Sequence, residues 1–252
     1  FENKATSTES ADESPAVNNL MVTTQIARYR SNIYECFYPR YQLLCNEPSV
    51  ALLMATRRSF FSLDLDIYDI QAGDHGDRFV PSSQMYLGTL QCLSIDRGIY
   101  RLIKYEGHGR YTQLAAFMAF SQEEAIGTVI QWKVIVPKEN PKSLSEKDEA
   151  LEKILIDVHN KYRLLPSGFT LFRSQKPVYE TFSKKHFAST LPKQFLPQQV
   201  KSVNLRSCDG KDRTLCRVAK TASDTFSCEF ARPMSTLLAF AFALCQLQPI
   251  IQ

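Results

Sequence analysis

The sequence predicts a mainly β protein: a closed antiparallel barrel threaded by an apolar helix near the C-terminus, with one or more short peripheral helices. Every residue from Leu237 to Cys245 is apolar, so a helix there must be buried on all sides. The run is shorter than the ~20 residues that cross a bilayer. Most preceding segments have strand patterns, and a closed barrel is one of few architectures that can surround a helix.

The composition is that of one globular domain. The chain has 252 residues, of which 44% are hydrophobic and 22% charged, which allows a large core. Residues 1–19 are rich in Ser, Thr, Glu, Asp and Ala and predict a disordered linker, which leaves 20–252 as the barrel domain. Because the chain begins at Phe1 without Met, we expect a piece of a longer protein.

Charge and cysteine content narrow the functional class. A net charge of +4 does not argue for nucleic acid, and no RNP or zinc-finger pattern is present, so we predict no nucleic-acid partner. The seven cysteines are scattered without a C-x-x-C pair, which favours reduced thiols of the cytosol or nucleus. No cysteine pair has a usual zinc spacing, and we predict no metal and no cofactor.

Strand-like runs fill the first half of the chain, at 41–45, 50–56, 61–70, 85–93, 98–105, 114–120 and 129–136. The turn signal Asn-Glu-Pro-Ser at 46–49 joins the first two runs into a hairpin. Within 61–70 the residues alternate, with Leu63, Leu65 and Ile67 on one face. We expect Asp64 and Asp66 on the solvent face.

A helix is predicted over 146–163, where the residues on one face are apolar: Leu151, Ile154, Leu155, Val158 and Tyr162. Ser143 with Glu146, or Ser145 with Asp148, can cap its start. Short strands are predicted at 170–172, 176–179, 200–205, 214–219 and 225–230.

The last predicted element is the apolar helix, 234–247, with Pro233 in its first turn and Pro249 ending it. Its predicted core side chains are Leu237, Leu238, Phe240, Phe242 and Leu244.

Several short motifs resemble the C-terminal domain of the tubby family. Near the end of the chain they are Arg217-Val218, Asp224-Thr225-Phe226, Pro233 and Leu238-Ala239-Phe240-Ala241. Upstream and in the same order they are Tyr38-Pro39, Leu87-Gly88-Thr89-Leu90, Gln113-Leu114-Ala115-Ala116, the strand 133–137, Lys176-Pro177-Val178-Tyr179 and Val200-Lys201. The resemblance spans residues 28–247. Within the family, the chain is similar to the branch whose members carry WD-repeat and SOCS-box regions upstream.

The resemblance implies a barrel of about twelve antiparallel strands around the C-terminal helix. It also implies binding of a phosphoinositide headgroup at the basic run that follows the strand 50–55. In this chain Arg57 and Arg58 occupy that run, whereas Gln91 replaces a second family cation. Further candidates from neighbouring strands are Arg97, Arg101 and Lys104. We interpret Phe60 and Phe61 as core strand residues in preference to membrane wedges.

The segments that resemble catalytic motifs do not indicate an enzyme. Cys208 and Arg213 resemble the C-x5-R loop of phosphoinositide phosphatases, but only four residues separate them and no helix pattern follows. We interpret the segment as a hairpin turn at Asp209-Gly210. The four histidines, His75, His108, His159 and His186, are dispersed, and no G-x-S-x-G motif accompanies them.

These observations predict a non-enzymatic tubby-type domain that binds phosphoinositide-bearing membranes peripherally, with a degraded basic site. The alternative is a protein-interaction module of a larger adaptor, such as a ubiquitin-ligase substrate receptor, without lipid binding. Protein partners are expected to bind through regions outside this chain. The expected location is the cytoplasm, peripheral to the plasma membrane, with the nucleus and the cilium as alternatives.

Overall fold

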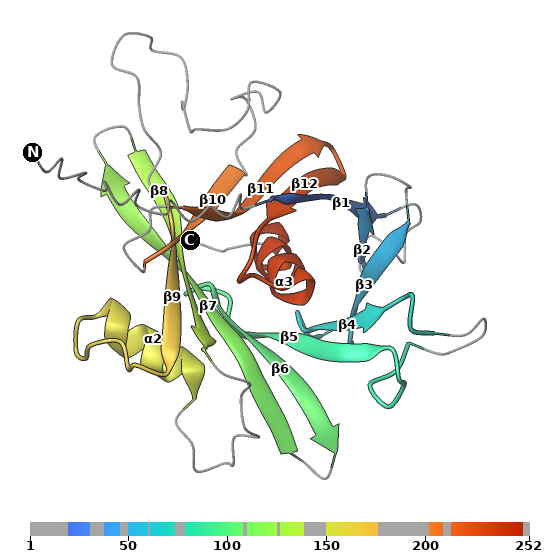
Figure 1. Ribbon diagram of the computed structural model, residues 1–252, viewed down its shortest axis with the longest axis horizontal. Helices are drawn as coiled ribbons and strands as arrows, with labels where there is room; N and C mark the ends of the chain where they lie inside the picture. The colour runs from blue at the N-terminus through green and yellow to red at the C-terminus, as the bar shows by residue number, and fades with distance from the viewer. Residues whose placement is uncertain are drawn as a thin grey trace, which may run out of the picture.

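Twelve strands form a closed barrel in which each strand pairs with its neighbours in sequence, and the barrel surrounds one helix (Figure 1). This computed structural model describes residues 20–30, 38–45, 50–59, 61–73, 79–107, 110–124, 127–138, 150–175, 202–208 and 213–248. The predicted linker 1–19 and the predicted strand 176–179 lie outside these residues. The predicted fold class is confirmed.

The strands are β1 (Val22–Tyr29), β2 (Arg40–Cys45), β3 (Ala51–Arg57), β4 (Leu65–Asp69), β5 (Tyr86–Ser94), β6 (Ile99–Gly107), β7 (Arg110–Glu124), β8 (Gly127–Pro137), β9 (Phe169–Ser174), β10 (Ser202–Ser207), β11 (Thr214–Ala222) and β12 (Thr225–Phe230). All neighbouring pairs are antiparallel, and β1 closes the barrel against β12. Consecutive connections therefore alternate between the two ends of the barrel. One end, which we call the β3–β4 end, is where β1, β3, β5, β7, β9 and β11 finish and the next strand begins.

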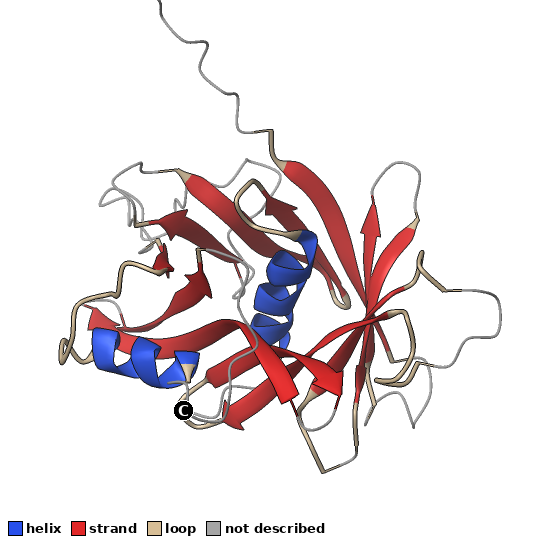
Figure 2. Ribbon diagram, turned by 60° about the horizontal axis from the view of Figure 1, so that its bottom comes forward, coloured by secondary structure: helices blue, strands red, loops and turns tan. Residues whose placement is uncertain are grey.

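The helix inside the barrel is α3 (Thr236–Leu247) (Figures 1 and 2). Its N-cap is Ser235, whose hydroxyl accepts the backbone N–H of Leu238 at 3.2 Å. Phe242 stacks on Phe117 of β7 with ring centroids 6.4 Å apart, and it meets the edge of Trp132 of β8 at 5.9 Å. The inward faces of the strands therefore pack directly on this helix.

The predicted buried helix is confirmed, with small differences at its start. Phe240, Phe242 and Leu244 have no exposed surface and Leu238 is 6% exposed, whereas Leu237 in the first turn is half-buried. The helix begins at Thr236, so Pro233 precedes it instead of occupying its first turn. The polar Ser235 provides the cap, which moves the start of the helix past the proline.

A second helix, α2 (Leu151–His159), packs on the outer face of the barrel against β6, β7 and β8 (Figure 2). Leu151, Ile154 and Leu155 are buried there. The backbone N–H of Leu151 donates to Oε1 of Gln113 at 2.7 Å, which caps the first turn from the barrel. The serine caps predicted at 143 and 145 lie outside the described residues.

The α2 helix ends earlier than predicted. The backbone N–H of Tyr162 donates to the carbonyl of Asp157, and that of Lys161 to the carbonyl of Val158, which is the hydrogen-bond pattern of a Schellman motif. Lys161 has a positive φ of 62°, which reverses the chain direction. Tyr162, which we placed on the buried face, is consequently 80% exposed.

The hairpin of β2 and β3 is confirmed, and two features of the strands near it were not predicted. The sequence did not predict β1, in which exposed Thr23 and Gln25 alternate with buried Thr24 and Ile26. The strand predicted at 61–70 is reduced to β4, because the chain before Leu65 forms a loop. A tight turn between β5 and β6 contains Gly98 at a φ of +56°, where a Cβ atom would lie 2.6 Å from Ala119.

We predict that Ala241→Asp destabilises the protein by several kcal/mol, because Ala241 has no exposed surface and the carboxylate would have no partner. Urea denaturation followed by circular dichroism measures the loss. The matched control is Ala72→Asp at an exposed turn, which we expect to stay within about 0.5 kcal/mol of the parent. Equal stability of the two variants would contradict the enclosed helix.

Candidate functional site

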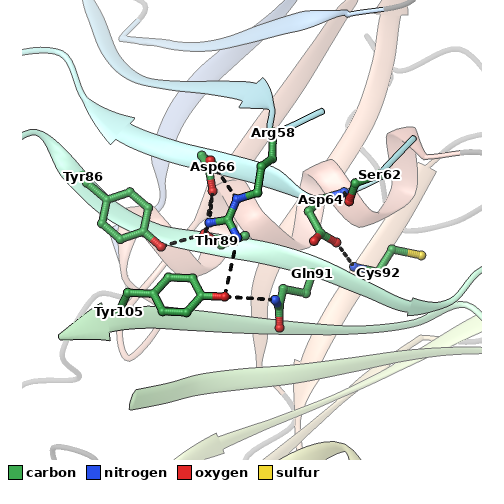
Figure 3. Close-up of polar contacts among 9 residues, drawn as sticks. All are labelled: Arg58, Ser62, Asp64, Asp66, Tyr86, Thr89, Gln91, Cys92 and Tyr105. Atoms are coloured by element: carbon green, nitrogen blue, oxygen red, sulfur yellow. Dashed lines mark hydrogen bonds and ion pairs between the residues drawn. The ribbon is translucent and has the colours of Figure 1, made fainter. Parts of the chain in front are cut away.

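Arg58, a predicted phosphate ligand, binds a carboxylate of the protein itself (Figure 3). Its Nη2 lies 2.8 Å from Oδ1 of Asp66 and its Nε lies 3.2 Å from Oδ2, which is a two-pronged ion pair. Nη2 also donates to the hydroxyl of Thr89 at 2.9 Å. The guanidinium lies over the ring of Tyr105, 5.2 Å from its centroid. Arg58 therefore stabilises the outer face of β4, β5 and β6.

The prediction that Asp66 faces solvent is wrong, since only 4% of this residue is exposed. The hydroxyl of Thr89 donates to Oδ1 of Asp66 at 2.6 Å, and Tyr86 contacts the same hydroxyl at 2.6 Å. Burial acts to lower the pKa of Arg58, but the hydrogen bonds that it donates to Asp66 and Tyr105, together with the charge of Asp66, raise that pKa above its ordinary value. The Arg58 guanidinium is therefore charged at every physiological pH.

Asp64 also has a structural contact. Its Oδ1 accepts the backbone N–H of Cys92 at 3.0 Å, and its own N–H donates to the hydroxyl of Ser62 (Figure 3). The carboxylate thereby ties the loop before β4 to β5. The alternation of aspartates that the sequence suggested for a solvent face instead joins neighbouring strands.

Arg101, another predicted site residue, is held by α2. Its Nη1 lies 3.1 Å from Oε1 of Glu152, and its Nε donates to Oε1 of Gln91 at 2.7 Å. Gln91 in turn contacts the hydroxyl of Tyr105 at 3.4 Å. Gln91, which replaces a family cation in the resemblance, thus links Arg101 to the neighbours of Arg58. Both arginines are matched by carboxylates.

Arg57 has a different environment at the β3–β4 end. Its position follows Leu53 and Ala55 on the inward side of β3, next to Tyr41 of β2. Burial raises the pKa of the Tyr41 hydroxyl, and the positive charges of Arg28, Arg57 and Arg30 oppose that rise. The structure therefore brings Arg57 close to Arg28, near the end of β1, and to Arg30, just after β1. We call Arg28, Arg30 and Arg57 the arginine cluster.

Two members of the cluster share a carboxylate. Oδ1 of Asp224 lies 2.7 Å from Nε of Arg28 and 2.8 Å from Nη2 of Arg30. Burial alone would raise the pKa of Asp224, but hydrogen bonds and charges from Arg28 and Arg30 hold it below its ordinary value. The side chain of Arg30 is 41% exposed, so its guanidinium is accessible to a ligand in solution.

Exposed apolar side chains lie at the same end of the barrel. Phe61, in the β3–β4 loop, is 96% exposed, and Leu93 near the end of β5 is 40% exposed. Tyr29 and Tyr38, which flank the β1–β2 connection, are each 37% exposed. The interpretation of Phe61 as a core strand residue is wrong, because the chain has not yet entered β4 there. Phe60 lies outside the described residues.

The remaining two candidates separate along β6. Arg97 lies exposed in the β5–β6 turn, at the β3–β4 end. Lys104 is exposed near the other end of β6. Seven residues of extended strand span about 20 Å, so these two cations do not belong to one site. Of the five predicted site residues, Arg57, Arg58 and Arg97 lie at the end that carries the exposed apolar side chains, and Asp66 engages Arg58 there.

The Cys208 segment connects two antiparallel strands. Cys208 follows β10, and Arg213 immediately precedes β11, so a strand and not a helix begins after the arginine. The Asp209-Gly210 turn itself lies outside the described residues. Within the described part of the chain, no three His, Cys, Asp or Glu side chains gather as a metal site would require. No helix among those residues is long and apolar enough to cross a membrane.

No model of a protein family matches this chain, and no curated protein sequence matches it. The tubby resemblance therefore stays a prediction from the motifs.

Sequence reasoning missed Arg28 and Arg30 as site residues. Their spacing of two places them on one side of a strand, but only the pairing of β1 with β2 brings them to Tyr41. Asp224 was noted as part of a motif without its role as their partner. A strand assignment for 22–29 would have supplied the missing signal.

We predict that Arg58→Gln destabilises the protein by about 2–3 kcal/mol, because it leaves the buried Asp66 carboxylate without its cation. The double variant Arg58→Gln/Asp66→Asn should recover part of that loss, since no unpaired charge remains. Urea denaturation of the parent and the two variants measures both effects. A single variant as stable as the parent, or a double variant weaker than the single one, would contradict the structural role.

Proposed function

We propose that this chain is a non-enzymatic, tubby-type domain that binds phosphoinositide headgroups at a membrane surface through the arginine cluster. The observation that carries the proposal is that Arg28, opposite Tyr41, and Arg30 share Asp224, and that Arg57 follows Ala55, the residue opposite Tyr41 on its other side. This is the barrel end where Phe61 is exposed. The tubby resemblance supports the same class of ligand. The domain then acts on the cytoplasmic side of the plasma membrane, as a peripheral protein.

Arginine suits this ligand because its planar guanidinium can donate two parallel hydrogen bonds to one phosphoryl group. A headgroup with two or more phosphates requires several cations at one place. The arginine cluster draws these from β1, the β1–β2 connection and β3, with Tyr41 between them. A phosphoryl group would compete with Asp224 for Arg28 and Arg30, which sets a modest affinity.

The apolar side chains at this end suit the boundary between headgroups and acyl chains. Aromatic residues with a polar edge, such as Tyr29 and Tyr38, are favoured at that depth. Phe61 can insert below the headgroups, while Arg97 in the adjacent turn stays at the anionic surface. A peripheral membrane site needs apolar side chains that insert and cations that contact the anionic surface, and the β3–β4 end has both.

The second candidate function is that of a protein-interaction module in a larger adaptor, and a specific observation favours it. Two of the predicted phosphate ligands, Arg58 and Arg101, are engaged by Asp66 and Glu152. Fewer cations then remain for a lipid than the sequence suggested. In that case the barrel serves as a protein-interaction module, and the exposed Phe61 contacts a protein partner.

We predict that the domain binds vesicles containing phosphatidylinositol bisphosphate more tightly than vesicles containing phosphatidylserine. Arg30→Gln/Arg57→Gln should weaken the former at least tenfold, because each charge-assisted contact contributes about 1.5–3 kcal/mol. Vesicle cosedimentation at several salt concentrations measures this, and binding should weaken as salt increases. We leave Arg58 intact because its loss would destabilise the barrel.

The matched control is Arg110→Gln, which removes an exposed arginine at the opposite end of the barrel. It should bind these vesicles as the parent does. A parent domain that does not sediment with bisphosphate vesicles even at low salt would refute the lipid proposal and favour the adaptor. Equal losses in the control and the double variant would place the membrane contact elsewhere.

We also predict that Phe61→Trp reports membrane insertion. Its fluorescence should shift to the blue with bisphosphate vesicles and be quenched by brominated acyl chains. Trp132, the chain's one other tryptophan, is 2% exposed and supplies an unquenched baseline. Phe61→Ser should weaken vesicle binding several-fold without loss of stability. Unchanged emission during full vesicle binding would show that Phe61 stays in water.

A further inference from the structure

Three cations form a row across the outer face of the barrel, away from the arginine cluster. Lys133 of β8 is directly opposite Arg173 of β9, and Arg173 is directly opposite Arg206 of β10. The intervening positions Trp132, Val134 and Phe172 pack into the core, so these three side chains lie on the outer side of the sheet. Arg173 is exposed there, whereas Lys133, beside His159 of α2, is only 8% exposed. We call Lys133, Arg173 and Arg206 the basic row.

Such a row is unusual because directly opposite residues in antiparallel strands have Cβ atoms about 5 Å apart. Like charges at that separation repel and destabilise the sheet. Arg173 is exposed, so its charge is available to solvent. A bound anion would reverse the sign of these interactions.

The C-terminal end of α2 extends the row. Nδ1 of His159 lies 3.0 Å from Nζ of Lys133, and both side chains pack on Phe120 of β7. Burial lowers the pKa of Lys133, and the charges of Arg173 and Lys161 lower it further, against an opposite effect of Cys208. The pKa of His159 is lowered by burial and by the charges of Lys133 and Arg173. The electrostatic environment here is dominated by cations.

The backbone conformation of Lys161 independently indicates that positive charge is concentrated at this place. This lysine adopts a φ of 62° at the position after the helix cap, where glycine is the usual residue. A lysine there costs stability that glycine would not. The negative end of the helix dipole favours a cation in this region, but it does not require one at the left-handed position. Lys161 thus places a positive charge near Lys133, and its left-handed conformation lowers the folding stability.

We propose that the basic row, with Lys161, binds a small soluble anion that carries at least two phosphoryl groups. Three neighbouring strands span about 10 Å, which accommodates two adjacent phosphoryl groups better than one. Lys133 is six residues along β8 from Gly127, so the row is about 20 Å from the β3–β4 end. A membrane held at that end would not present its headgroups here, which favours a free ligand over a lipid.

Isothermal titration calorimetry with inorganic pyrophosphate tests this proposal on the whole chain. We expect binding at one site in the parent, at least tenfold weaker in Arg173→Gln and in Lys161→Gly. Both variants should melt at the parent temperature or above it without ligand, because one removes like-charge repulsion and the other relieves a strained φ. A residue with only a structural role would instead lower the melting temperature. Lys153→Gln, an exposed charge early in α2, is the matched control and should bind as the parent does.

Two further experiments distinguish binding at the basic row from binding at the arginine cluster. Arg30→Gln/Arg57→Gln should keep pyrophosphate binding, and Arg173→Gln should keep binding to bisphosphate vesicles. Failure of the parent to bind pyrophosphate, or unchanged affinity in Arg173→Gln, would overturn the proposal. Loss of pyrophosphate binding in the arginine-cluster variant would place the anion there instead. Loss of vesicle binding in Arg173→Gln would identify the ligand as a lipid headgroup and overturn the assignment to a free anion.

Discussion

The enclosure of α3 is the constraint on which the rest of the structure depends. A helix that is apolar on every side has no stable place in water, and here strands on all sides bury it. Closing the barrel also pairs every strand with a neighbour on both sides over at least part of its length, which limits the strand edges that a partner could extend. The inward positions of the strands pack the core around α3, which leaves the two ends and the outer face for recognition.

Charged residues on this barrel fall into two groups. Some stabilise the outer face, as Arg58 does with Asp66 and Arg101 does with Glu152, and these link β4, β5, β6 and α2. Others gather as neighbouring cations, as Lys133 and Arg173 do across β8 and β9, or share a single carboxylate, as Arg28 and Arg30 do with Asp224. The distinction depends on strand register: a shift by one residue would turn every one of these side chains to the other face. Function is therefore sought among the second group.

The sequence predicted the elements whose signals are local. The apolar run that became α3 and the hairpin of β2 and β3 need only periodicity and turn residues. Contacts between distant strands could not be predicted in this way. Asp66 is part of an alternating pattern that usually marks a solvent face, yet Arg58, Thr89 and Tyr86 bury it. Phe61 is an apolar residue beside a strand, and only the loop before β4 exposes it.

The central claim is that the β3–β4 end of the barrel meets an anionic membrane. Hydrogen–deuterium exchange, measured with and without bisphosphate vesicles, tests it most directly because every peptide reports at once. The account predicts slowed exchange at the β1–β2, β3–β4 and β5–β6 connections, with α2 and the strands β8 to β10 unchanged. Slowed exchange confined to the opposite end, or to α2 and β8 to β10, would contradict it.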